Sequence, residues 1–381
     1  MTSTRSLNIL LVAGEASGDL HGGRLVRALK ERAPQGQIFG IGGEGMASAG
    51  MELLFHIRDM AVVGFTEVIR HLPFLRRVMR TLEAEIIRRR PRVAVLIDYP
   101  GFNLRFARIA KREGIKILYY ISPQVWAWNK KRVKTMGGVV DQMKVVFPFE
   151  VELYRKEGID VEFVGHPLVE NMRSSSTRAD FFEAKGLDPK RKLLALLPGS
   201  RKQEVEKILP TMIDAALRLQ QKDNVQAAIG VASSLGVTFV KQFVPLDSGV
   251  TIVEDGTYDL MKHADAAIVT SGTATLETGW FATPMVVVYR TSSLTYLIGR
   301  LLIDVPYIGL VNIVAGKKVV PEFIQHEMNA TNLASAVGKI LEDRNYAAAM
   351  REGLSVINKK LGAPGASARV ADGIIRLAEA A

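Results

Sequence analysis

The sequence predicts an α/β protein built from two doubly wound, Rossmann-like domains that face a central cleft. In each half of the chain, short β-rich runs alternate with helix-length amphipathic segments, a rhythm typical of parallel sheets. The strand runs are almost wholly apolar, as expected where helices cover both faces of a sheet. The length of 381 residues suits two such domains, since an ordinary domain has about 100 to 200 residues.

The order of these runs sets the expected domain boundaries. In the first half, strands are expected at 8–13, 37–41, 93–97, 116–121 and 143–147. The rhythm restarts after the turn at 165–167 and a polar stretch, with strands expected at 193–197, 225–231, 266–270 and 285–288. Helical patterns dominate from Thr331, and Pro364 indicates a bend that redirects the last helix. We therefore expect domains over 1–168 and 169–355, and a final helix within 356–381 that packs back on the first domain.

The composition excludes several kinds of site. The chain has no cysteine, which excludes disulfides, thiol catalysis and cysteine-based zinc sites. The six histidines show no ligand spacing, so no bound metal is expected. The best candidate for a membrane span, 301–316, is interrupted by Asp304 and Asn312 and is shorter than the roughly 18 to 20 residues required. A net charge of +11 admits phosphate-bearing substrates, anionic lipids or nucleic acid.

A phosphate-binding loop is predicted where the strand at 193–197 meets the next helix. The loop reads Pro198-Gly199-Ser200-Arg201, and the helix that follows carries Glu204. Free backbone N–H groups at a helix start attract anions, and Arg201 adds a bidentate donor. We expect Gly199, Ser200, Arg201 and Glu204 to bind the diphosphate of a sugar nucleotide. The alternative is an ordinary strand-to-helix turn with a surface arginine.

A second loop of this kind follows the strand at 266–270. It contains Ser271, Gly272 and Thr273, and Glu277 lies one helical turn further on. A carboxylate there can accept hydrogen bonds from a ribose diol, so these four residues are predicted to bind the nucleotide. The alternative is a helix cap, which stabilises the helix by about 1 kcal/mol and has no other function.

Two loops in the first half are candidates for the sugar or the acceptor. The first strand ends in Gly14, followed by Glu15, Ser17, Gly18 and Asp19, whose acids suit hydroxyl groups and repel a diphosphate.

The strand at 93–97 delivers Asp98 to the same edge of the sheet, and Asn103 follows one turn later. Asp98 is the best candidate for a general base, because the carboxyl ends of parallel strands line the ligand site. For both loops the alternative is a helix cap.

The segment at 40–45 contains the pattern GxGxxG, which is typical of dinucleotide-binding loops. We discount it, because it follows the second strand and the next acid at a suitable spacing, Glu67, falls in a helical pattern.

A basic, apolar segment follows at 62–77 and continues to Arg88-Arg89-Arg90. Such a face suits a membrane surface, but its apolar side could equally pack into the core. The candidate membrane contacts are Val62, Val63, Phe65, Val68, Leu72, Phe74, Leu75, Arg76 and Arg77. Trp126 and Trp128 stand near a cluster of lysines, but no nucleic-acid module accompanies them, so no nucleic-acid partner is expected.

Taken together and in order, these motifs resemble those of the bacterial lipid-A-disaccharide synthases, glycosyltransferases of the two-Rossmann-domain GT-B architecture. The resemblance spans nearly the whole chain, and its most distinctive segment is SPQVWAW at 122–128. The other matching segments are 12–19, 97–98 with 102–103, 147–150, 164–167, 196–201 with Glu204, and 271–277.

The resemblance implies a reaction and its residues. The donor would be UDP-2,3-diacylglucosamine and the acceptor 2,3-diacylglucosamine 1-phosphate; the products would be a β-1,6-linked disaccharide 1-phosphate and UDP, with no cofactor and no divalent metal. Asp98 would take the proton of the acceptor 6-hydroxyl, although Glu15 stays open as the base. Arg201 would stabilise the leaving UDP. Asn312 would also bind the nucleotide, although this chain has Val311 where the family pattern has a proline.

The lipid substrates also favour membrane contact by 62–77. The resemblance thus implies a cytoplasmic protein held peripherally on the inner face of the bacterial inner membrane, and a homodimer is compatible with it. Two alternatives stay open: a UDP-sugar 2-epimerase of the same architecture, and a membrane-bound nucleotide-sugar binding module without catalysis.

Overall fold

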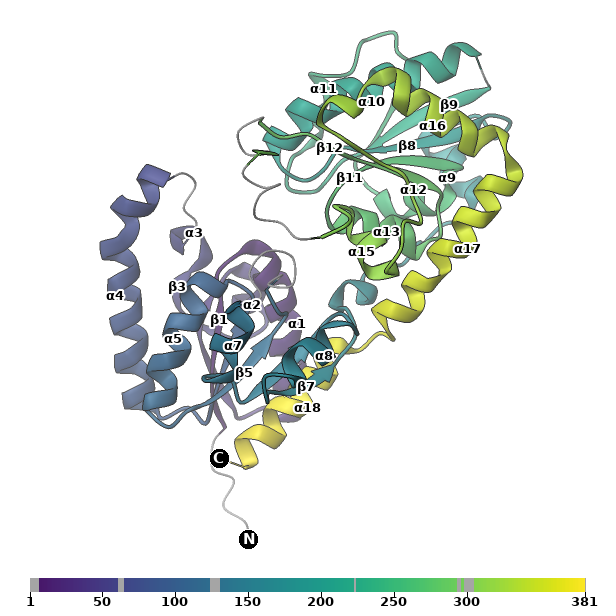
Figure 1. Ribbon diagram of the computed structural model, residues 1–381. Helices are drawn as coiled ribbons and strands as arrows, with labels where there is room; N and C mark the ends of the chain where they lie inside the picture. The colour runs from purple at the N-terminus through teal and green to yellow at the C-terminus, as the bar shows by residue number, and fades with distance from the viewer. Residues whose placement is uncertain are drawn as a thin grey trace. The chain divides into compact units, whose positions relative to one another are not determined.

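A computed structural model describes residues 7–60, 65–123, 131–222, 224–292, 296–297 and 305–380, without the side chains of 65–71, 131–132 and 222. The chain divides into two compact units. The first unit comprises Met1–Glu170 together with Leu361–Ala381, and the second comprises Asn171–Lys360 (Figure 1). The last helix therefore belongs to the first unit, although about 190 residues of the second unit separate it from the rest of that unit in the sequence.

The first unit contains a seven-stranded parallel sheet with the order β3-β2-β1-β4-β5-β6-β7. Its strands are β1 (Asn8–Ala13), β2 (Gln37–Gly42), β3 (Glu52–His56), β4 (Val93–Ile97), β5 (Lys116–Tyr120), β6 (Gln142–Val145) and β7 (Asp160–Phe163). Its helices are α1 (Ala16–Arg32), α2 (Glu44–Ser48), α3 (Ile57–Met60), α4 (Phe65–Arg89), α5 (Pro100–Arg112), α7 (Lys131–Gly137), α8 (Glu150–Arg155), η1 (Pro167–Glu170) and α18 (Ala366–Glu379).

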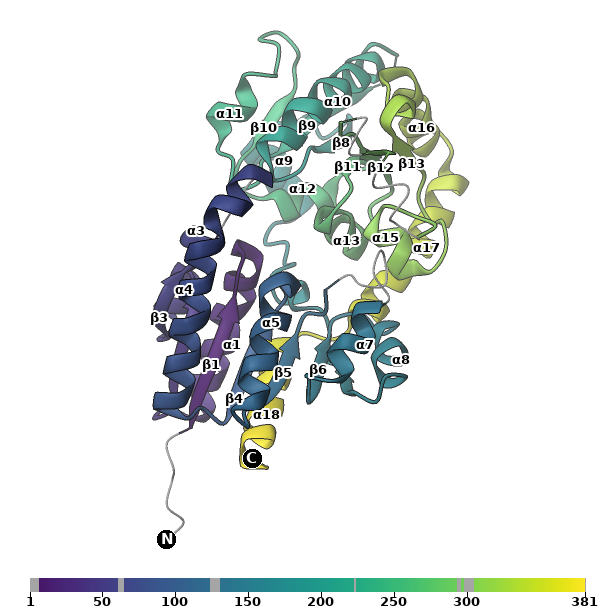
Figure 2. The same ribbon diagram turned by 60° about the vertical axis from the view of Figure 1, so that its left-hand side comes forward.

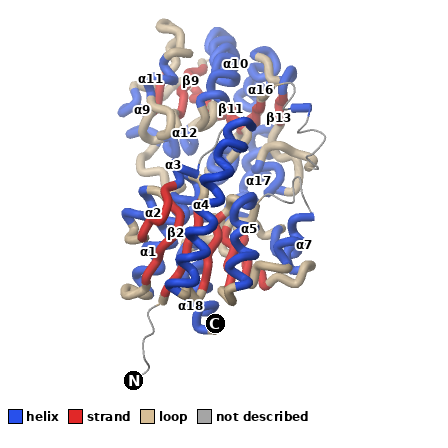
Figure 3. Tube along the Cα trace, turned by 90° about the vertical axis from the view of Figure 1, so that its left-hand side faces the viewer, coloured by secondary structure: helices blue, strands red, loops and turns tan. Residues whose placement is uncertain are grey.

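Helices cover both faces of this sheet. α4 and α5 lie on one face, and α1 packs beside α18 on the other (Figures 1 and 2). α4 runs along the strands of the sheet, with Val78, Leu82 and Ile86 fully buried against the core (Figure 3). β1 and β4 are almost completely buried, as two-sided cover requires.

The second unit repeats the plan with a six-stranded parallel sheet of order β10-β9-β8-β11-β12-β13. Its strands are β8 (Lys192–Leu197), β9 (Val225–Gly230), β10 (Thr251–Val253), β11 (Ala266–Thr270), β12 (Met285–Tyr289) and β13 (Glu322–Ile324). Its helices are α9 (Arg178–Lys185), α10 (Lys202–Lys222), α11 (Val237–Lys241), α12 (Thr257–His263), α13 (Thr273–Trp280), α15 (Leu310–Ala315), η2 (Gln325–Glu327), α16 (Ala330–Glu342) and α17 (Arg344–Leu361). α10 and α16 pack together over one face, and α12 and α13 lie on the other.

The predicted fold class of two doubly wound α/β domains is confirmed, and the nine predicted strands are present with small differences at their ends. β5 stops at Tyr120, because Ile121 has a left-handed backbone (φ 60°), and β6 spans Gln142–Val145, not 143–147. Four strands were missed: β3, β7, β10 and β13. All four are the outer strands of their sheets, and their residues are mostly half-buried. Such strands lack the continuous apolar run by which a buried strand is recognised.

Candidate active site

The order of strands locates a candidate site in each unit. In the first sheet the order reverses between β1 and β4, and in the second between β8 and β11. Ligands of doubly wound sheets bind outside the carboxyl ends of the strands at this switch point. The loops that follow these four strands begin at Gly14, Asp98, Pro198 and Ser271. These loops and the helices that follow them contain all the predicted catalytic and ligand-binding residues except Asn312.

In the first unit, Glu15 and Asp98 follow neighbouring strands. Ala13 is paired with Ile97 in the sheet, so the two loops start side by side. The Asp98 carboxyl is largely buried, and burial is the main reason that its pKa is raised from 3.8 to about 6. The negative charge of Glu15 raises the pKa of Asp98 further, and a backbone hydrogen bond from Tyr99 lowers it. A carboxyl with a pKa near 6 is suited to accept a proton at neutral pH.

This electrostatic coupling predicts a pH dependence. We expect kcat/KM for the reaction at this site to rise as the pH increases through about 6 and then to level off, because the predicted base, Asp98, accepts a proton only when it is ionised. Glu15→Gln removes the neighbouring negative charge, so the pKa of Asp98 should fall. The acidic limb of the pH profile, where kcat/KM rises with pH, should then move to lower pH, even if the variant also changes the maximal rate. Rates measured across this range in both proteins test the prediction. A limb that stays in place in Glu15→Gln would contradict the coupling.

Asp19, predicted to bind the sugar, is engaged by the backbone of its own unit. Its carboxylate accepts hydrogen bonds from the N–H groups of Gly43 at 2.7 Å, Gly45 at 2.9 Å and Met46 at 3.0 Å. A Cβ at Gly43 would lie 2.7 Å from this carboxylate, so a glycine is required there. Backbone N–H groups of the GxGxxG segment thus bind the Asp19 carboxylate of the same chain, so they are not available to a phosphate.

The neighbours of Asp19 differ in exposure. Gly18 is buried, and a Cβ added to it would lie 3.2 Å from the Cβ of Ala13, so it serves close packing of α1 on β1. Glu15 and Ser17 are exposed. Of this loop, Glu15 and Ser17 are therefore the residues that can reach a ligand.

Asn103, also predicted to contact the acceptor, is completely buried. Its side-chain amide donates to the carbonyls of Ile97 at 3.2 Å and Asp98 at 2.7 Å. The geometry therefore favours a role in holding the loop over direct contact with a substrate.

In the second unit, the loop after β8 has the form expected for an anion site. Gly199 has φ 105°, a backbone conformation that favours glycine, and a Cβ there would lie 2.7 Å from Glu204 Oε2. Ser234 donates its hydroxyl to the carbonyl of Ser200 at 3.0 Å, which ties the loop to the end of β9. Arg201 is 78% exposed and pairs with Glu204 at 2.7 Å. Glu204 thus contacts Arg201, and a direct contact with the nucleotide stays a prediction.

The loop after β11 leaves room for a ligand. Gly272 has φ 149°, and an added Cβ would meet no atom of the described residues within 4 Å. Thr273 is exposed, whereas the Ser271 hydroxyl donates to the carbonyl of Ile308 at 2.7 Å. Burial raises the pKa of the Glu277 carboxyl, and a hydrogen bond from Tyr258 acts against this rise. Glu277 is therefore a partly buried acceptor, and its contact with a ribose diol stays a prediction.

The Asn312 side chain, predicted to bind the nucleotide, has all its partners within its own unit. Its amide donates to the Val320 carbonyl and to Glu322 Oε1, both at 2.9 Å, while its oxygen accepts from Val319 at 2.8 Å and Val320 at 3.0 Å. Asparagine has two donor hydrogens and two acceptor positions, so all are used. The structure does not favour the predicted nucleotide contact, because this fully buried amide binds the loop before β13.

Two residues near these loops were missed from the sequence. Tyr258 donates its hydroxyl to Glu277 Oε1 at 2.9 Å and holds this carboxylate in place. The Thr270 hydroxyl is buried at the end of β11 with no hydrogen-bond partner among the described residues, and its methyl group would lie 3.5 Å from a Cβ at Gly199. A hydroxyl at the carboxyl end of a central strand is a signal that could have identified Thr270. Tyr258 lies inside α12, where the sequence holds no such signal.

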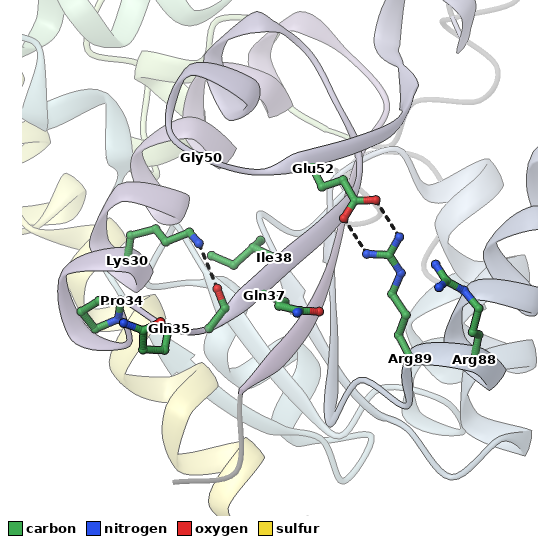
Figure 4. Close-up of a pocket in the computed structure, with 10 residues that line it drawn as sticks. Lys30, Pro34, Gln35, Gln37, Ile38, Gly50, Glu52, Arg88 and Arg89 are labelled. Carbon is green, nitrogen blue, oxygen red and sulfur yellow. Dashed lines mark hydrogen bonds and ion pairs between the residues drawn. The ribbon is translucent and has the colours of Figure 1, made fainter.

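A separate cavity of about 560 Å³ lies at the opposite edge of the first sheet, where β2 and β3 begin (Figure 4). Its cations are already paired: Arg89 contacts both oxygens of Glu52 at 2.6 Å, and Lys30 donates to the carbonyl of Gly36 at 2.9 Å (Figure 4). Arg88 pairs with Glu85 at 2.6 Å. The cavity is away from the carboxyl ends of the strands, so we do not assign the reaction to it.

The predicted membrane segment is only partly described. Val62, Val63, Trp126 and Trp128 lie outside the described residues, as do the side chains of Phe65 and Val68.

Of the remaining candidates, Phe74 and Leu75 pack against the core of the first unit. The ring of Phe74 meets that of Phe55 edge to face, with 6.0 Å between the ring centroids. These two residues are therefore committed at least partly to the core, while Arg76 and Arg77 are exposed and Leu72 is half-buried. No helix in the described part of the chain is long and apolar enough to cross a bilayer. Within the same residues, no group of three or more acids and histidines is placed to hold a metal ion.

Solved structures with the same fold are numerous. A UDP-N-acetylglucosamine 2-epimerase from Neisseria meningitidis, bound to its UDP-sugar, superposes with a TM-score of 0.64 at 10% identity over 97% of this chain and all of that one. The calicheamicin glycosyltransferase CalG4 superposes with a TM-score of 0.63 at 14% identity over 98% of each chain. These similarities show the two-Rossmann-domain fold alone, since the identities are so low.

Sequence relatives identify the family. The family model described as lipid-A-disaccharide synthetase matches residues 9–363. The lipid-A-disaccharide synthase of Geobacter sulfurreducens is 45% identical over 99% of each chain, and that of Syntrophus aciditrophicus is 48% identical over 95% of this chain and 96% of that one. The family model and these relatives agree with the fold and with the four strand-end loops, and they show that the chain belongs to the lipid-A-disaccharide synthetase family.

Proposed function

We propose that this protein transfers 2,3-diacylglucosamine from UDP to the 6-hydroxyl of 2,3-diacylglucosamine 1-phosphate. The products are the β-1,6-linked disaccharide 1-phosphate and UDP. Membership of the family makes the protein a glycosyltransferase of lipid A biosynthesis. The observation that supports a base-assisted transfer is the largely buried carboxyl of Asp98, which stands at a strand-order switch point and whose pKa is raised to about 6; the two lipid sugars are proposed from membership of the family.

The proposed chemical step assigns roles to residues of each unit. Asp98 accepts the proton of the acceptor 6-hydroxyl as the oxygen attacks the anomeric carbon of the donor. The bond between that carbon and the UDP oxygen breaks, and UDP leaves with the bonding electrons. Arg201 and the N–H groups at the start of α10 then stabilise the negative charge that develops on the diphosphate. Glu277, held by Tyr258, accepts hydrogen bonds from the ribose.

The epimerase alternative has little support. The epimerases among the structural neighbours share the fold at 10 to 14% identity, whereas the relatives at 40 to 48% identity are lipid-A-disaccharide synthases. One assay separates the two reactions. A transferase releases UDP only when both lipid sugars are present, and acylated and deacylated substrates compared in pairs show whether the acyl chains are recognised. Conversion of the donor alone to its 2-epimer, with no transfer to a second lipid sugar, would overturn the proposal.

We further propose that the protein acts on the inner face of the membrane as a peripheral protein. Support comes from its lipid substrates, the net charge of +11 and the exposed Arg76 and Arg77 on α4. Phe74 and Leu75 are left out of this surface because they pack against the core. The remaining candidates are Leu72 and the residues 62, 63, 65 and 68.

A vesicle assay tests this surface. Replacing Arg76 and Arg77 by serine, together with Val63→Ser and Phe65→Ser, should shift the protein from vesicles rich in anionic lipid to the supernatant. Affinity for UDP should not change. The matched control replaces Arg105 and Arg108, exposed arginines on the neighbouring α5, and should pellet like the wild type. Equal loss of pelleting in both proteins would mean that only net charge matters and would contradict a specific surface.

A further inference from the structure

The backbone around Asp98 is strained. Asp98 and Tyr99 have φ 46° and 47°, in the left-handed region that side chains other than glycine rarely adopt. Among the described residues they are the only two neighbours in the sequence that both have such angles without being glycine. A conformation of this kind persists only where the surroundings hold it, and it is common at active sites.

Two buried side chains hold this turn. The carbonyl of Asp98 accepts hydrogen bonds from the Asn103 amide, at 2.7 Å, and from the Tyr119 hydroxyl. The Asn103 amide also donates to the carbonyl of Ile97 at 3.2 Å, and the Asn103 N–H to that of Tyr99 at 3.1 Å. Asn103 and Tyr119 are completely buried and come from different elements, α5 and β5. The Asp98 carbonyl is thus fixed from two sides.

The ring of Tyr99 links this turn to the loop that carries Glu15. A Cβ at Gly14 would lie 2.2 Å from Tyr99 Cδ1, so the ring rests directly against the backbone of Gly14. The pKa of the Tyr99 hydroxyl is raised, first by burial and then by the charge of Glu15. If the turn at Asp98 relaxed, Tyr99 would leave Gly14, and the Asp98 carboxylate would move with respect to Glu15.

We propose that Asn103 and Tyr119 are positioning residues that hold the Asp98–Tyr99 turn and so aim the Asp98 carboxylate at the acceptor hydroxyl. The inference rests on the proposed role of Asp98 as the base. It assigns Asn103 a task other than contact with the sugar, and it brings in Tyr119, a strand residue outside the four loops. Two hydrogen bonds to one carbonyl are the means: they keep the Asp98 peptide from rotating into an unstrained conformation.

The test compares Tyr119→Phe with a control variant that also loses one buried tyrosine hydroxyl. Tyr154→Phe is the control, because Tyr154 is completely buried in the same unit and its hydroxyl contacts Ser122 instead. In Tyr119→Phe, kcat should fall roughly 10- to 100-fold with KM for both substrates little changed, since a small displacement of a reacting group has effects of this size. The acidic limb of the pH profile should move to lower pH, because a relaxed Asp98 is less buried and further from Glu15. Tyr154→Phe should keep the position of the limb.

Asn103→Leu provides a second, independent variant and should change kcat and the pH limb in the same directions. If it does not fold, Tyr119→Phe decides alone. Normal kcat and an unmoved limb in Tyr119→Phe would overturn the positioning role, whatever its melting temperature. This failure is distinct from failure of the proposed function, which would appear as full transfer activity in Asp98→Asn.

Discussion

Replacing Asp98 by asparagine is expected to lower the rate of sugar transfer by about 100-fold or more, the usual contribution of a general base. Affinity for UDP should be unchanged, because the proposed nucleotide site consists of loops of the second unit. Asparagine keeps the size of the side chain and tolerates the left-handed backbone that Asp98 adopts, so the turn should persist. Single-turnover rates and UDP titrations by calorimetry measure the two quantities separately.

A stability measurement controls for misfolding of this variant. The pKa of Asp98 is raised in the folded protein, from 3.8 to about 6, so ionising Asp98 weakens the fold as the pH rises through this range. The asparagine variant should therefore melt no lower than the wild type at neutral pH. Asp160→Asn, an exposed acid at the start of β7, is the matched control and should keep full activity. Equal loss of transfer and of UDP affinity in Asp98→Asn would refute its role as the base.

Removing the Arg201 side chain should have the second large effect. With Arg201→Ala, kcat is expected to fall about 100- to 1,000-fold, as when one donor to a developing negative charge is removed. Arg201 is largely exposed and held at one side by Glu204, so its guanidinium is oriented without being buried. Arg201→Lys should recover only part of the rate, because an ammonium group lacks the paired donors of a guanidinium.

Two further variants show whether a loss of kcat in Arg201→Ala is specific to this side chain. Arg351→Ala removes an exposed arginine from α17 of the same unit and should leave transfer unchanged, which controls for the loss of one positive charge. Glu204→Gln keeps Arg201 but removes the charge of its partner, so it should have a smaller effect than Arg201→Ala. A wild-type kcat in Arg201→Ala would mean that the N–H groups of the loop stabilise UDP by themselves.

The interior of the fold could be predicted from the sequence with little error. β1, β4 and β11 were placed with their observed bounds, because a strand that is covered on both faces has an apolar side chain at nearly every position. β3 and β13, at the outer edges of their sheets, have no such pattern and were missed. Their identity as strands depends on pairing with a neighbour that is remote in the sequence.

The candidate site divides in the same way. The carboxyl ends of parallel strands meet at one edge of each sheet, so the loops at Glu15 and Asp98 could be assigned to a candidate site in the first unit, and those at Gly199 and Ser271 to one in the second, before the structure was known. The partner of each polar side chain in those loops could not be assigned.

Asp19, Asn103 and Asn312 have the residue types of ligand contacts, yet each binds backbone groups of its own unit. The sequence by itself determined the two sheets, the position of the loops and the family. Only the tertiary structure decided which polar groups face outwards, because a buried carboxylate or amide binds whatever donor or acceptor the packing brings within reach. The same packing decided that Tyr119, an ordinary strand residue by its sequence, holds the turn on which Asp98 depends.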